Sequence, residues 1–193
     1  MTFVADDKTL ADLKRWEGSV GWIYLDVRGL PTVGVGNLLA TKAAALQLPF
    51  LVVNGAAPLP ATPGQIGAAY DRVKGMIPAR SPDAYRLHPS IELAAPEIDH
   101  LLRKRLDNEF LPGLRQMFQG WDNLPATARS GLLDMAFNLG LGGLRRFEHL
   151  REAVQDRKWL IASKECNRRT CRDSRNQWTR EQFLEASLPP VVS

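Results

Sequence analysis

The distribution of proline along this 193-residue chain most restricts how it can fold. Eight of the thirteen prolines fall between Pro49 and Pro96. A proline inside a helix removes a backbone hydrogen bond and clashes with the preceding turn. Long helices are therefore excluded from residues 40–96, which are also rich in alanine, although short helices fit at Ala40–Gln47 and Gly64–Met76.

Residues 97–186 are expected to be helical almost throughout, because their apolar residues recur at intervals of three and four. Pro96 and Glu97 suit the start of a first helix, and Gly140 suits the end of a second. The residues that share a face are Ile98, Leu101, Leu102, Arg105, Leu106 and Phe110 in the first, and Leu132, Leu133, Ala136 and Leu139 in the second. Further short helices are expected around Phe147, Leu150, Val154 and Leu160.

The segment at residues 16–36, WEGSVGWIYLDVRGLPTVGVG, has a different pattern. A first helix with Leu10, Leu13 and Trp16 on one face is expected to stop at Gly18. Strand-forming residues on both sides of the turn at residues 28–31 predict a twisted hairpin, in which Gly34 and Gly36 let the backbone approach closely. The sequence thus predicts an α+β fold in a single domain, with a small N-terminal hairpin lobe (1–96) and a larger helical lobe (97–193).

Charge and cysteine content limit the classes of function. The net charge is +4, and residues 145–185 hold eleven Lys/Arg against seven acidic residues, an excess equal to that of the whole chain. A basic face of this kind meets nucleic acid, an anionic membrane surface or an anionic cell-wall polymer. The two cysteines, Cys166 and Cys171, are too few for a disulfide framework; one local bridge and two free thiols, at least one of them buried, both remain open.

Two carboxyl groups and a hydroxyl near the hairpin suit glycosidic bond hydrolysis, which needs one protonated carboxyl and one ionised carboxylate. Glu17 falls at the C-terminal end of the first helix, beside Trp16 and within reach of Trp22, and both settings are expected to raise its pKa. Asp26, in a polar turn, is expected to stay charged, and Thr32 could hold a water. Taken singly, these residues also suit a solvent-exposed helix end, an Asx turn and an ordinary strand position.

The pattern resembles the phage-type lysozymes, glycoside hydrolase family 24. Their signature is matched, with its spacing, by Glu17-Gly18, Tyr24-Leu25-Asp26, Gly29 and Thr32-Val33-Gly34-Val35-Gly36. Weaker matches follow at Asp134–Gly140 with Phe147, similar to the family's central helix, and at Arg175-Asn176, similar to its arginine-bearing segment. The resemblance implies a lysozyme-like fold with an active cleft between the two lobes.

The resemblance also implies roles for single residues. Glu17 would be the general acid, Asp26 and Thr32 would position the hydrolytic water, and Asn138 would line the cleft. Arg175 would pair with and chiefly orient the catalytic glutamate, and Gly36 would belong to the substrate-binding or orienting set. Two features depart from the family: Asn138 stands where the T-even phage member has glutamine, and residues 40–96 are longer than their counterpart.

The resemblance implies the function of a muramidase, which hydrolyses the β-1,4 bond between N-acetylmuramic acid and N-acetylglucosamine in peptidoglycan, with inversion. A chitinase-like hydrolase and a non-catalytic peptidoglycan-binding module are the alternatives. Nucleic-acid binding is the weakest alternative. It would use Arg168, Arg169, Arg172 and Arg175, but acids alternate with these arginines and no aromatic platform accompanies them. No cofactor or metal is expected, since His88, His100 and His149 lack ligand spacing and suit surface or capping positions.

The sequence and the family resemblance also give expectations for localisation and partners. The N-terminus has acids where a secretory signal has bases, and no stretch approaches the length of a membrane span, so no membrane insertion is expected. The chain is expected to be made in the cytoplasm as a monomer and to act in the periplasm or cell wall. It would arrive as a phage endolysin released through a holin, or as an antibacterial type VI secretion effector with a cognate immunity protein.

Overall fold

The computed structural model describes residues 7–55 and 57–188. The described residues form two compact units: one is Leu10–Arg105, and the other combines residues 7–9 with residues 106–188. The strands lie in the first unit and the second is helical, which confirms the α+β class. The division falls after Arg105, within a helical stretch, whereas composition placed the lobe boundary after residue 96.

The first unit begins within a helix, α1, and continues with a hairpin, two elements that the sequence predicted. Helix α1 (Asp7–Glu17) buries Leu10 and Leu13 and ends at Gly18, whose N–H donates to the Lys14 carbonyl at 2.9 Å. Strand β1 (Val20–Leu25) pairs antiparallel with β2 (Pro31–Gly34), and a short β3 (Asn37–Leu38) pairs with β2. The expected hairpin is therefore confirmed.

The Pro/Ala-rich region contributes three strands that the sequence did not predict. They are β4 (Leu51–Val53), β5 (Leu59–Pro60) and β6 (Ser90–Glu92). Strand β6 pairs with β1 through Trp22 and Glu92, so the six strands form one antiparallel sheet in the order β3-β2-β1-β6-β4-β5. The hairpin is thus one half of a larger sheet.

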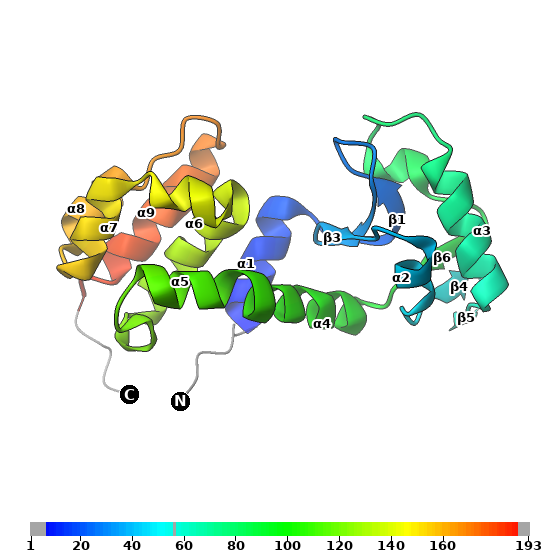
Figure 1. Ribbon diagram of the computed structural model, residues 1–193, viewed down its shortest axis with the longest axis horizontal. Helices are drawn as coiled ribbons and strands as arrows, with labels where there is room; N and C mark the ends of the chain where they lie inside the picture. Colours follow the sequence, from blue (N-terminus) through cyan, green and yellow to red (C-terminus); the bar gives the residue numbers. More distant parts are fainter. Residues whose placement is uncertain (1–6, 56, 189–193) are drawn as a thin grey trace. The chain divides into compact units, whose positions relative to one another are not determined.

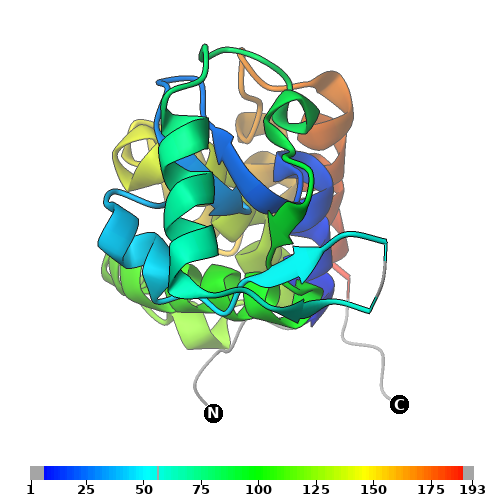
Figure 2. The same ribbon diagram turned by 90° about the vertical axis from the view of Figure 1, so that its right-hand side faces the viewer.

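The two helices expected in this region are present. Helix α2 (Lys42–Leu46) begins after Thr41, whose hydroxyl accepts from the Ala44 N–H. Helix α3 (Pro63–Lys74) has a capping box of Thr62 and Gln65, and it packs against β1, β2 and β6 (Figure 2). The apolar core under α3 consists of Ile23, Ile66, Ala69, Tyr70, Val73, Tyr85 and Ile91. Tyr85 ends the 3₁₀ helix η1 (Pro82–Tyr85).

Helix α4 (Ala95–Arg105) closes the first unit by packing on β2 and β3. Two glycines make this approach possible. At Gly34 (φ +66) an added Cβ would lie 3.3 Å from the Ile98 side chain, and at Gly36 (φ +71) it would lie 3.3 Å from Arg105 Nη1. The expected close approach of backbone at these glycines is confirmed.

The second unit is a set of packed helices (Figure 1). It contains the π-helical turn η2 (Leu106–Phe110), α5 (Leu111–Met117), the 3₁₀ turn η3 (Trp121–Asn123), α6 (Ala126–Arg145), α7 (Glu148–Gln155), α8 (Trp159–Glu165) and α9 (Asp173–Glu185). Helix α9 packs against α6 and α8, and α7 packs against α8. Gly140, where the second helix was expected to end, interrupts α6 with φ +71 and ψ 162.

Among the described residues, no helix is both long enough and apolar enough to cross a membrane. The three histidines are exposed, as the sequence predicted.

Candidate functional site

The residues that match the family's first motif all lie in the first unit, around the β1–β2 hairpin. Glu17 is the last residue of α1 and its side chain is exposed. The aromatic neighbour predicted for it, Trp22, donates its indole N–H to the Pro82 carbonyl at 2.8 Å and lies against the Arg86 guanidinium.

Asp26 directly follows β1 and organises the hairpin turn. Its Oδ1 accepts from the N–H groups of Arg28 and Leu30, each at 2.9 Å, and its Oδ2 lies 3.4 Å from the exposed Arg28 guanidinium. Every one of these partners is a donor, an arrangement that suits a carboxylate. The Asx-turn role that the sequence allowed for Asp26 is therefore present, and the half-buried carboxylate keeps one oxygen outside the main-chain contacts.

Thr32 is connected to Asp26 through the main chain of Leu30. The Thr32 side chain is buried, and its Oγ1 donates to the Leu30 carbonyl at 3.0 Å. Leu30 in turn donates its N–H to the Asp26 carboxylate. The structure thus brings Asp26 and Thr32 together on one backbone residue. Since the hydroxyl proton of Thr32 is used by Leu30, its oxygen is left as an acceptor.

Tyr24 connects these groups electrostatically with Glu17. Burial raises the pKa of its phenol, and the carboxylates of Asp26 and Glu17 raise it further, while a backbone hydrogen bond from Gly36 and the Arg105 guanidinium lower it. Because such charge effects weaken with distance, both carboxylates lie within electrostatic reach of one phenol. Glu17, Asp26 and Arg105 are thus the charged residues that act on the Tyr24 phenol.

Arg105 is a further residue at the hairpin whose role the sequence did not reveal. Its Nη1 donates to the carbonyls of Val35 and Gly36, at 3.3 and 3.1 Å. The signal was present, because Arg105 occupies an apolar position in the helical pattern of residues 98–110. A charged residue on a buried helix face needs a polar partner, and the glycine-rich turn after β2 supplies it.

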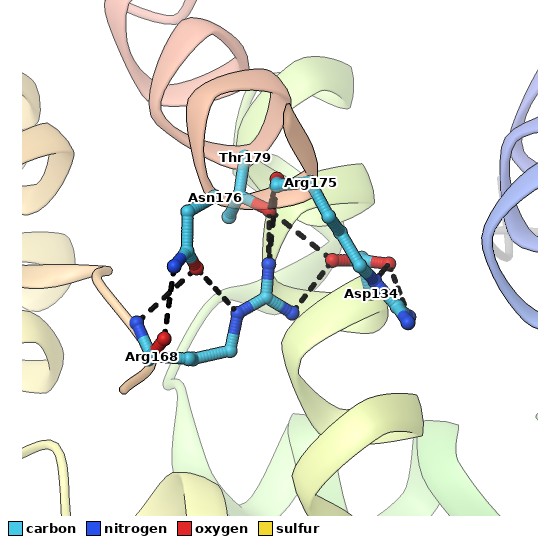
Figure 3. Close-up of polar contacts among 5 residues, drawn as sticks. All are labelled: Asp134, Arg168, Arg175, Asn176 and Thr179. Carbon is cyan, nitrogen blue, oxygen red and sulfur yellow. Dashed lines mark hydrogen bonds and ion pairs between the residues drawn. The ribbon is translucent and has the colours of Figure 1, made fainter. Parts of the chain in front are cut away.

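Arg175 and Asn138 belong to the second unit. Asn138 is an exposed residue of α6. Arg175 is 6% exposed, and its Nε and Nη2 donate to Asp134 Oδ1 at 2.9 and 2.7 Å (Figure 3). The partner that the structure identifies for Arg175 is therefore Asp134 on α6. The pairing of Arg175 with Glu17, a residue of the other unit, stays a prediction.

A second buried arginine completes this cluster. Arg168 is 2% exposed, and its Nη1 donates to Asp134 Oδ2 at 2.8 Å. Its Nε donates to Asn176 Oδ1 and its Nη2 to Thr179 Oγ1, which itself lies 3.1 Å from Asp134 Oδ2. Asp134, with no predicted role of its own, thus binds two guanidinium groups, and the side chains around it satisfy their remaining donors (Figure 3).

This cluster corrects the expected basic face. Of the four arginines considered for nucleic-acid binding, Arg168 and Arg175 are buried against Asp134, while Arg169 and Arg172 are exposed. Part of the positive excess in residues 145–185 is therefore internal. Composition could not reveal this, because a buried, paired arginine counts the same as one on the surface.

The two cysteines are free thiols, Cys166 buried and Cys171 half-buried. Burial raises the pKa of Cys166 to about 11, against the opposing effect of the nearby Arg168 charge. A thiol with so high a pKa is a poor nucleophile near neutral pH. Cys166 is thus a buried free thiol.

Over residues 7–55 and 57–188, no three His, Cys, Asp or Glu side chains gather as a metal site. No protein-family model and no curated protein matches this chain.

Proposed function

We propose that this chain is a muramidase of the phage-type lysozyme kind, which hydrolyses the β-1,4 bond between N-acetylmuramic acid and N-acetylglucosamine. The observation that supports this most directly is the grouping around the hairpin. Tyr24 feels the charge of both Glu17 and Asp26, and Leu30 ties Asp26 to Thr32. An acid, a base and a water-holding hydroxyl are what inverting hydrolysis requires.

In the proposed mechanism Glu17 gives its proton to the glycosidic oxygen as the bond to the anomeric carbon breaks. A water attacks that carbon from the opposite face of the sugar ring and loses a proton to Asp26. Because the Thr32 hydroxyl donates to Leu30, its oxygen accepts from this water. Two acceptors, Thr32 Oγ1 and an Asp26 oxygen, then accept hydrogen bonds from the two O–H groups of the water, whose lone pair points at the sugar; only the proton bonded to Asp26 is transferred. In an inverting pair the carboxyls are about 6.5–9.5 Å apart, which leaves room for the water.

One specific observation favours a second candidate function, that of a non-catalytic peptidoglycan-binding module. The described contacts of the Asp26 carboxylate are all with its own turn, so the hairpin needs Asp26 whether or not the protein has activity. Glu17, an exposed residue at the end of α1, is the proposed general acid, which hydrolysis needs and binding alone does not. Its substitution therefore separates the two candidates.

The test compares the release of reducing ends from purified peptidoglycan by the native protein and by Glu17→Gln. Removal of a general acid is expected to lower the rate by about 10²–10⁴-fold, while Glu165→Gln, which changes another exposed glutamate, leaves the rate unchanged. An α-anomeric product, observed by NMR at early times, would identify inversion. Equal rates for native protein and Glu17→Gln would refute the proposed acid, and turnover of chitin oligomers in preference to peptidoglycan would favour the chitinase-like alternative.

As part of the same proposal, the enzyme acts in the bacterial periplasm or cell wall, either as a phage endolysin or as an antibacterial effector. For the effector, the partner is an immunity protein that covers the hairpin residues Glu17, Asp26 and Thr32.

A further inference from the structure

Two neighbouring loop tips of the first unit expose large apolar side chains. Val27, at the tip of the β1–β2 hairpin, is 93% exposed, and Ile77, in the loop between α3 and η1, is 65% exposed. The two loops lie together at one end of this unit (Figures 1 and 2), and a Cβ added at Gly29 would be 3.3 Å from the Pro78 side chain. The apolar residues exposed on this loop-tip surface are Val27, Leu30, Ile77, Pro78 and Ala79.

Hydrogen bonds fix the backbone of both tips. In the hairpin, Asp26 accepts from the N–H groups of Arg28 and Leu30. In the other loop, the buried Tyr85 hydroxyl donates to the Ile77 carbonyl at 3.0 Å and accepts from the Arg80 N–H at 3.2 Å. Apolar side chains in water are unfavourable, and these turns hold them on the outside. A contiguous exposed apolar surface of this kind is typical of an interaction site.

The side chains around the loop-tip surface are mainly cationic. Over residues 26–30 and 72–84, four basic residues stand against two acidic ones. Arg72 and Arg80 are exposed and form no ion pair with a described residue, and the Arg28 side chain, 3.4 Å from Asp26, is 69% exposed. The basic residues are Arg28, Arg72, Lys74 and Arg80, and the acidic ones are Asp26 and Asp83. The complementary partner is therefore anionic and accepts apolar groups.

We propose that the loop-tip surface binds the surface of an anionic lipid bilayer. Val27 and Ile77 enter the headgroup layer, and the arginines beside them contact lipid phosphates while their methylene stems cover apolar surface. The shape favours lipid over a protein. Protein interfaces are packed as closely as protein interiors, so a protein partner would need hollows matched to two projecting tips, whereas lipid headgroups rearrange around them. This inference goes beyond the proposed hydrolysis and does not depend on it.

The experiment measures co-sedimentation of the full chain with two kinds of lipid vesicle. One kind contains phosphatidylglycerol with phosphatidylethanolamine, and the other contains phosphatidylcholine alone. Because each cation near an anionic bilayer adds to binding, partition into the phosphatidylglycerol vesicles should be at least about tenfold stronger and should fall as salt is added. Absence of binding to phosphatidylglycerol, or equal binding to both kinds of vesicle, would overturn the inference.

Substitutions test which residues make the contact. Val27→Ser and Ile77→Ser should each weaken vesicle binding about tenfold, and Arg80→Gln about fivefold. Two matched controls should bind as the native protein does: Leu59→Ser, since Leu59 is also 65% exposed but lies on the edge strand β5, and Lys104→Gln, which removes an exposed cation of α4. Because all five residues are exposed, the melting temperature should not change. An equal loss in Leu59→Ser, or native binding by Val27→Ser and Ile77→Ser, would overturn the inference.

The outcomes separate this inference from the proposed function. Glu17→Gln should bind vesicles as the native protein does while losing hydrolysis, and Ile77→Ser should cleave lipid-free peptidoglycan at the native rate. Vesicle binding without cleavage would overturn the muramidase proposal alone, and cleavage without vesicle binding would overturn the lipid contact alone. Loss of cleavage with unchanged vesicle binding in Ile77→Ser would assign the loop tips to the glycan and overturn the lipid contact.

Discussion

Two aspartates, one in each unit, are held in opposite ways. Asp26 is half-buried and accepts from main-chain N–H groups two and four residues further along the chain. Asp134 is 1% exposed and binds the side chains of Arg168 and Arg175, 34 and 41 residues away. The first contact forms locally and leaves a carboxylate open to solvent, so it is available for chemistry. The second joins distant segments and excludes solvent, so it belongs to the architecture of the helical unit.

The largest effect is expected for Asp134→Asn. The neutral amide leaves two buried guanidinium groups without a counter-charge, and the loss of one partner of a buried ion pair costs about 3–5 kcal/mol. Urea denaturation of the native and variant proteins measures this change in the free energy of unfolding. Asp71→Asn is the control, because it removes an exposed ion pair with Lys42, and such pairs contribute about 0–1 kcal/mol. Similar losses of unfolding free energy in the two variants would show that the buried cluster contributes no more to stability than the exposed ion pair.

An intermediate effect is expected for Asp26→Ala, which removes the acceptor of two backbone N–H groups in the turn. The free energy of unfolding should fall by about 1–3 kcal/mol. Asp26→Asn keeps an acceptor oxygen there and should cost about 0.5 kcal/mol or less. Both variants should lose peptidoglycan cleavage by about 10²–10⁴-fold, because neither has a base for the water. Full activity of a folded Asp26→Asn variant would show that Asp26 stabilises the turn and takes no part in catalysis.

The hairpin was predictable because its signals are local. Glycine marks the end of α1, the Arg28–Pro31 turn separates two β-rich runs, and each partner in the Asp26 turn is within four residues. The break in α6 at Gly140 was predictable for the same reason. These positions depend on backbone conformation, which a few neighbouring residues decide.

Two other parts of the molecule depend on contacts that the sequence does not display. Strand β6 is three residues long and acquires its place only by pairing with β1 and β4, so its pattern resembled a proline-rich loop. The roles of Arg168 and Asp134 likewise depend on how α9 packs on α6. The proposed catalytic roles of Glu17, Asp26 and Thr32 came from motif spacing, and they remain predictions for the assays above.

The smallest effect is expected for Thr32→Val, which keeps the shape of the side chain but removes one hydrogen bond to Leu30. The free energy of unfolding should fall by about 1 kcal/mol. The kcat for peptidoglycan should fall about tenfold with little change in KM, because the hydroxyl contacts the water and not the sugar. Thr32→Ser, which keeps the hydroxyl, should restore most of the kcat; failure to do so would remove Thr32 from the mechanism.

The shared attachment of Asp26 and Thr32 to Leu30 has a mechanical consequence. In the proposed mechanism, a tilt of the hairpin tip moves the Asp26 carboxylate and the Thr32 hydroxyl together, because both are hydrogen-bonded to Leu30. Only the position of these two groups relative to Glu17 changes, because Glu17 lies on a different element, α1. A bound substrate would then change the direction of the proposed attack while the two groups that hold the water stay together.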